Sequence, residues 1–248
     1  MLADISVLQL ALIAIVAVLT SIIGGLAGYG TGALMPLVLV PIVGPEPVVP
    51  IIAFSALLTN ASRAIAFRAA INRRCVAIVL VAAVPTCILG AWGYTTLSGS
   101  GVLILIGTVM VASVPLRRFA LGRGFKLGDR ALAAASVGWG MIVGGTTGAG
   151  AILLSMLLAA GLNGAAVIAT DAAISIAIGL VKVTVFGVAG VIDAKVIAVA
   201  ALIGLAAFPG AFLAKRLVDK LPLRAHVAIL DVVVATGGAL LILGAITR

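Results

Sequence analysis

Two basic residues, Arg63 and Lys182, lie deep inside long apolar stretches of the chain. A charge near the centre of a bilayer costs about 2.5–3.5 kcal/mol even on insertion scales, so such residues are typically retained to bind something. If stretch 47–68 spans the membrane, helix geometry places Arg63 about 6 Å past the midplane toward the cytoplasm. Stretch 164–192 is expected to run the opposite way, which places Lys182 on the other side. Two cations would then flank the bilayer centre, where they suit an anionic ligand.

Each cation also has an explanation that involves no ligand. Arg63 could extend with Arg68 to the membrane interface, because long basic side chains reach toward water. Lys182 has no such exit nearby, so we expect its charge to be offset either by an anion or by a carboxylate.

Hydroxyl and amide groups precede both cations within about three helical turns. Such groups can donate hydrogen bonds to an oxyanion, and they also bond one membrane helix to another. Asn60 is the one that we predict to contact the substrate. The groups concerned are Thr59, Asn60, Ser62, Thr170 and Ser175.

Two carboxylates, Asp171 and Asp231, are also expected within apolar segments, and neither has an acidic counterpart in the other half of the chain. Asp171 precedes Lys182 by eleven residues, or about 16 Å along one helix, so the two cannot pair directly. Each carboxylate is therefore a candidate coupling site for a proton, or the partner of a cation on another helix.

Glycine-rich breaks interrupt the apolar pattern twice. A discontinuous helix at such a break can present backbone N–H groups and a helix N-terminus to an anion. Glycines four residues apart also allow helices to pack closely, and both uses remain open. The break residues that we predict to contact the substrate are Gly28, Tyr29, Gly30, Thr31, Thr147, Gly148 and Gly150.

The composition sets the class of protein that must position these residues. Hydrophobic residues make up 64% of the 248 residues and charged residues 9%, and the mean hydropathy is +1.39. These values exclude a soluble enzyme, a nucleic-acid-binding domain and a disordered protein. About eight to ten helical segments fit, because a spanning helix needs roughly 20 apolar residues. The expected segments are 7–24, 33–43, 47–68, 76–97, 102–116, 131–144, 151–162, 164–192, 196–217 and 225–247.

The segments form the same five-part pattern twice, with short or broken helices in each half. Four glycines of the first break, at 24, 25, 28 and 30, recur 120 positions later, which indicates an internal duplication. Basic clusters mark cytoplasmic loops, and they follow non-equivalent segments in the two halves. We therefore predict an all-α membrane protein of two inverted-topology repeats. Its parts are a first repeat 1–116, a basic cytoplasmic linker 117–130 and a second repeat 131–248.

Several kinds of chemistry lack the residues they require. The single histidine, His226, excludes an H-E-x-x-H metal site, and the chain has neither a P-loop nor a G-x-S-x-G motif. We therefore expect no metal, no cofactor and no enzymatic activity. Cys75 and Cys87 are twelve residues apart on one expected helix and cannot form a disulfide there.

The duplicated layout, with Gly28-Tyr29-Gly30-Thr31-Gly32 before Pro36 and Gly148-Ala149-Gly150 in the second half, resembles the sulfite exporter TauE/SafE family. This resemblance spans nearly the whole chain and implies a multi-pass transporter of the cell (inner) membrane that carries small sulfur-containing anions. We accordingly predict a secondary transporter of sulfite, a sulfonate or a related anion, working by alternating access. Its partners would be the anion, the lipid bilayer and a coupling ion such as a proton, without nucleic acid. The alternatives are an anion channel, a carboxylate transporter, a structural subunit or a membrane-embedded enzyme.

Overall fold

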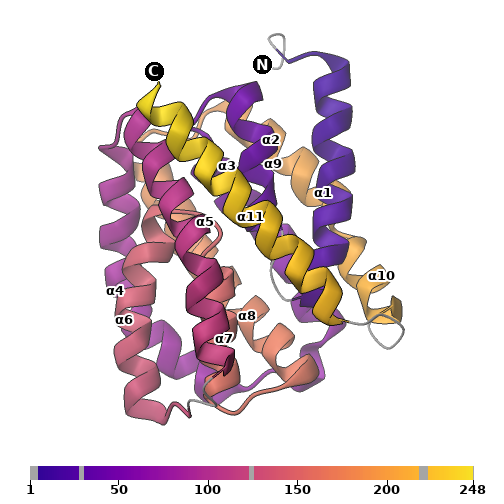
Figure 1. Ribbon diagram of the computed structural model, residues 1–248, viewed down its shortest axis with the longest axis vertical. Helices are drawn as coiled ribbons and strands as arrows, with labels where there is room; N and C mark the ends of the chain where they lie inside the picture. Colours follow the sequence, from indigo (N-terminus) through magenta and orange to yellow (C-terminus); the bar gives the residue numbers. More distant parts are fainter. Residues whose placement is uncertain (1–4, 28–30, 123–125, 218–222, 248) are drawn as a thin grey trace.

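The computed structural model describes residues 5–27, 31–122, 126–217 and 223–247, and within these ranges the regular elements are all helical (Figure 1). The elements are α1 (Val7–Ala27), α2 (Thr31–Val43), α3 (Val48–Ala66), η1 (Arg68–Ala70), α4 (Arg73–Thr95), α5 (Gly99–Gly122), α6 (Asp129–Gly145), α7 (Gly150–Ala159), α8 (Gly164–Val188), α9 (Ala194–Ala207), α10 (Gly210–Leu217) and α11 (Leu223–Ile246).

Most of these helices are apolar enough to contact lipid along their length. In the described part of the chain, six candidate spans are long and apolar enough to cross a bilayer. The short apolar helices α2 and α7 follow the two glycine breaks, at the places where the apolar pattern predicts short segments. The all-α, multi-pass membrane architecture is thus confirmed.

Two expected boundaries differ from the structure. Segment 196–217 is divided into α9 and α10 around Phe208 and Pro209, because proline supplies no N–H to the helix and its ring crowds the preceding turn. The predicted linker 117–130 is partly helical, since α5 continues to Gly122 and α6 already begins at Asp129. Residues 116–121 include neither glycine nor proline, so the basic stretch can extend the helix.

The helices α3 and α8 pack against each other in antiparallel fashion. Arg63, near the end of α3, lies beside Asp171 near the start of α8. Further along the pair, a Cβ on Gly179 of α8 would lie 3.6 Å from the carbonyl oxygen of Ala53 in α3. On one side α4 packs on α6, on the opposite side α1 packs on α9 and α10, and α5 lies beside α11 (Figure 1).

Small residues explain the close approach of α4 and α6. A Cβ added to Gly144 of α6 would lie 2.9 Å from the backbone nitrogen of Ala91, and one added to Gly90 of α4 would lie 3.0 Å from that of Gly145. Gly144 therefore allows α6 to pack closely on α4, one of the two uses expected of the break glycines. Gly148 instead lies in the turn that follows α6, where its φ is positive. Cys75 and Cys87 of α4 are buried free thiols, as expected.

Candidate functional site

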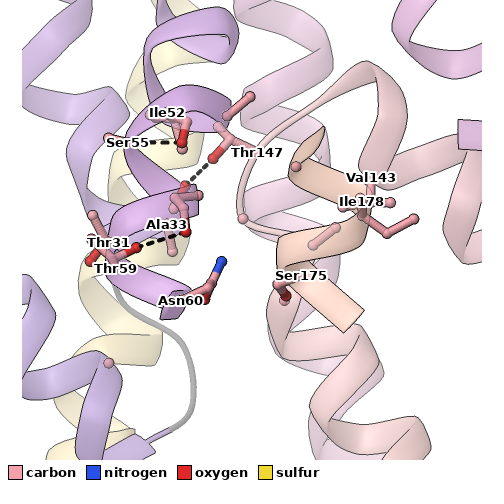
Figure 2. A pocket seen from close by; sticks show the side chains of 18 of the residues that line it. Thr31, Ala33, Ile52, Ser55, Thr59, Asn60, Val143, Thr147, Ser175 and Ile178 are labelled. Atoms are coloured by element: carbon pink, nitrogen blue, oxygen red, sulfur yellow. Dashed lines mark hydrogen bonds between the residues drawn. The ribbon is translucent and has the colours of Figure 1, made fainter. Parts of the chain in front are cut away.

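A cavity of about 130 Å³ lies between α3, α8 and the two glycine breaks (Figure 2). A water molecule needs roughly 10–15 Å³ on the same measure, so the cavity has room for several waters or one small anion. Among the predicted site residues, those that line it are Thr31, Asn60, Arg63, Thr147, Gly148, Gly150, Asp171 and Lys182.

The other predicted site residues are not part of this lining. Asp231 is buried on α11 and lies outside the residues that line the cavity. Gly28, Tyr29 and Gly30 lie outside the described residues.

The two breaks touch each other although they are far apart in the sequence. The Thr147 hydroxyl donates a hydrogen bond of 2.5 Å to the carbonyl of Gly32, at the start of α2 (Figure 2). Gly148 adopts φ +83°, a conformation that side-chain-bearing residues rarely take, and a Cβ there would lie 3.7 Å from the Cα of Ala33. This turn lets the chain reverse between α6 and α7 within a few residues.

Both breaks direct a helix N-terminus to the cavity. Thr31 opens α2 and Gly150 opens α7, and the cavity is lined by these first turns. The first amides of a helix have no intrahelical acceptor, and neither first turn carries an acidic side chain. Two partial positive charges therefore face the same small space, an arrangement that favours an anion. The Trp139 indole fixes the start of α7 by donating to the Ala149 carbonyl at 3.0 Å.

The Lys182 ammonium lies at the C-terminus of α6, the helix that ends at the second break. Its ammonium donates to the carbonyl oxygens of Val143, at 2.8 Å, and Thr146, at 2.7 Å, which lie at the C-terminus of α6. A cation at this position satisfies carbonyls that have no intrahelical donor and stabilises the negative end of the helix dipole. An anion or a carboxylate was expected as its partner, and the structure instead shows backbone oxygens.

Arg63 forms the central ion pair of the site. One guanidinium nitrogen lies 3.2 Å from Oδ2 of Asp171, and another donates to Oδ1 of Asn60. The Arg63 side chain is 14% exposed and that of Asp171 is 2% exposed. Arg63 therefore turns into the protein rather than toward the interface, and Asp171 is the partner of a cation on another helix, one of its two predicted roles.

Asn60 presents a donor to the cavity. Because its Oδ1 accepts from Arg63, its amide nitrogen is directed away from that residue. Figure 2 shows the side chain extending toward the space between α3 and the helix that carries Ser175. The cavity lining thus combines two cations, one carboxylate, neutral donors and two helix N-termini, with an excess of positive charge suited to a small anion.

Sequence reasoning missed some polar members of this lining. Ser21, Ser55 and Thr146 also line the cavity, and all three are buried. Hydroxyl residues are common in membrane helices, so their types alone do not distinguish them from groups that bond to their own helix. Ser55, for example, donates to the carbonyl of Ile52 on the preceding turn.

A multi-pass helical membrane protein with an anion-suited cavity at two broken helices belongs to the class of membrane transport proteins. The family model described as sulfite exporter TauE/SafE matches residues 13–241, and the chain belongs to this family. It is therefore a transporter of the cell membrane and not an enzyme, as the resemblance implied. Comparison with curated proteins and with solved structures gives no match.

Proposed function

We propose that the protein is a secondary transporter of a small sulfur-containing anion, such as sulfite or a sulfonate, and that the anion binds in the cavity between the two breaks. The observation that carries this proposal is the meeting of the N-termini of α2 and α7 beside Arg63 and Asn60. An oxyanion with three oxygens can accept from several of these donors at once. The family description supports a sulfur oxyanion over other small anions.

The packing of the helices supports two structural repeats, because contacts made by helices of one half have counterparts made by helices of the other. If α1 corresponds to α6, α3 to α8, and α4 to α9 with α10, two major contacts have counterparts. The contact of α4 with α6 matches that of α9 and α10 with α1, and the contact of α3 with α9 matches that of α8 with α4. Together with the basic loops, this pattern supports inverted repeats. Arg63 and Lys182 then have corresponding positions in the two halves, although each has its own partner.

In this proposal two phenylalanines gate access to the cavity from opposite ends of the α3–α8 pair. Each follows a cation by one helical turn, and neither is among the residues that line the cavity. Phe186 follows Lys182 and is fully buried, with its ring centroid 5.6 Å from that of Tyr94. Phe67 follows Arg63 and packs in a small cluster with Ile168 and Ala169. Alternating access would open the packing around one phenylalanine while the packing around the other stays closed. Movement of the anion would be coupled to a second ion, for which a proton is the candidate.

The proposal is tested by binding to the purified protein. We expect sulfite and methanesulfonate to stabilise it against thermal unfolding, and acetate and succinate to do so less. Asn60→Ala should weaken anion binding about ten- to a hundred-fold, since it removes a hydrogen bond to a charged group worth about 1.5–3 kcal/mol. Asn163→Ala is the matched control, because Asn163 is exposed at the start of α8 and makes no side-chain capping bond there.

Three outcomes would contradict the proposed function. Tighter binding of carboxylates than of sulfite would assign a carboxylate transporter. The absence of binding by every anion in the panel would remove the cavity as a substrate site. In liposomes, an anion flux that does not saturate and shows no exchange would assign a channel.

A further inference from the structure

One oxygen of the Asp171 carboxylate stands out among the buried side-chain atoms that the structure describes. Oδ2 faces Arg63 at 3.2 Å, whereas Oδ1 is buried and has no hydrogen-bond partner. A buried polar atom without a partner is costly and rare in folded proteins, so it calls for an explanation. Asp171 is among the residues that line the cavity, so its carboxylate lies next to any small species bound there.

Asp171 and a transported anion would compete for the same cation, Arg63. The guanidinium of Arg63 is already engaged by Asn60 and Asp171, and all three residues line the cavity. An anion that approaches the Arg63 guanidinium is repelled by the Asp171 carboxylate, which lies 3.2 Å from that guanidinium. Because both charges would lie inside the protein rather than in bulk water, that repulsion is strong, and neutralising the carboxylate removes it.

We propose that Asp171 carries the coupling proton of transport: it takes up one proton on Oδ1 when an anion binds beside Arg63, and gives it back when the anion leaves. This inference rests on the proposed function of the cavity. The proton comes from the aqueous phase on the side where the anion enters, and one O–H bond forms on the carboxylate. The bound anion then replaces Asp171 as the counter-charge of Arg63. A monoanion and its proton together add no net charge to the cavity, so this step does no work against the membrane potential.

Asp171 is the carboxylate among the described residues that line the cavity, so it is the candidate acceptor of the coupling proton. From α3 it faces the guanidinium of Arg63, which carries N–H donors and no acceptor atom. On its own helix, Lys182 lies about 16 Å further along and is held by the carbonyls of α6. The helix α4 packs against α8 and carries Arg73, Arg74 and the buried thiols of Cys75 and Cys87. The turn η1 also packs on α8 and carries Arg68. The oxygen of the neighbouring Thr170 hydroxyl accepts a hydrogen bond from the backbone N–H of Asn72 at 3.0 Å, and a neutral hydroxyl does not take up a proton near neutral pH.

The test measures proton uptake when methanesulfonate binds to the purified protein in weakly buffered detergent solution. Methanesulfonate does not titrate near neutral pH, so any proton taken up belongs to the protein. We expect about one proton per bound anion, and an affinity that falls by up to tenfold for each unit of rising pH, because binding and protonation are linked. Asp171→Asn, which mimics the protonated side chain, should bind the anion with no proton uptake and no pH dependence. Asp231→Asn, which changes the buried carboxylate outside the cavity, should keep both.

Each other outcome has a definite meaning. Anion binding by the parent protein without proton uptake overturns the inference, even if Asp171→Asn fails to fold. Proton uptake that persists in Asp171→Asn, or is lost in Asp231→Asn instead, also overturns it. If neither methanesulfonate nor sulfite binds to the parent protein, the proposed function of the cavity fails, and with it the basis of this inference.

Discussion

Replacing Arg63 by methionine is expected to lower the free energy of unfolding by about 3–5 kcal/mol, because the substitution leaves a buried carboxylate without its counter-ion. Asp171 is almost fully buried, and the guanidinium of Arg63 is the cation that lies 3.2 Å from it. Methionine keeps much of the length of arginine, so the loss reports mainly the missing charge. Unfolding of the purified variant by denaturant or heat in detergent measures the effect.

The double variant Arg63→Met/Asp171→Asn is the control for this prediction. Removing both members of a buried ion pair is far less costly than removing one, so most of the lost stability should return. A double variant as unstable as Arg63→Met alone would show that the two residues do not stabilise the protein as a pair. The measurement would then contradict the role that we assign to Asp171 as the partner of Arg63.

Replacing Lys182 by methionine should have an effect of similar size for a different reason. The variant leaves the carbonyls of Val143 and Thr146 without their donor, and each unsatisfied buried group costs about 1–3 kcal/mol. The C-terminus of α6 also loses the cation that opposes its dipole. We expect the free energy of unfolding to fall by about 2–6 kcal/mol, and anion binding to weaken because the neighbouring turn at Gly148 loses its support.

Lys126→Met provides the matched comparison for Lys182→Met. Lys126 is exposed between α5 and α6, so its replacement should change stability by less than about 0.5 kcal/mol. If Lys182→Met melts like the parent protein, the bonds to α6 contribute nothing to the fold. If it remains stable and loses only anion affinity, Lys182 would be a ligand contact rather than a helix cap.

The sequence predicted the helices well because their signals are local. The ends of the apolar runs, at glycine, proline and charged residues, lie within a few residues of most helix ends. The kink at Pro209 was missed, since the apolar run continues on both sides of it. The basic stretch after Leu116 was taken as a linker because of its charge, whereas its helix-forming residues extend α5 to Gly122.

Several residues that line the cavity could be named from the sequence, but the groups with which they pair could not. Buried charge and broken helices are visible in the sequence, and for this reason Arg63, Asp171, Lys182 and the second break were identified. Which groups meet depends on how helices far apart in the sequence pack. The antiparallel contact of α3 with α8 brings Asp171 to Arg63, and the end of α6 brings its carbonyls to Lys182. No local pattern encodes these contacts.

Counterflow of labelled sulfite in proteoliposomes tests most directly that this cavity carries a small sulfur-containing anion across the membrane. Vesicles that contain the parent protein and are loaded with unlabelled sulfite should transiently accumulate external labelled sulfite, and unloaded vesicles should not. Arg63→Met/Asp171→Asn, the variant expected to fold, should lose this accumulation because Arg63, the cation beside which the anion binds, is gone. Absence of counterflow with the parent protein, or equal counterflow with the folded double variant, would contradict the account.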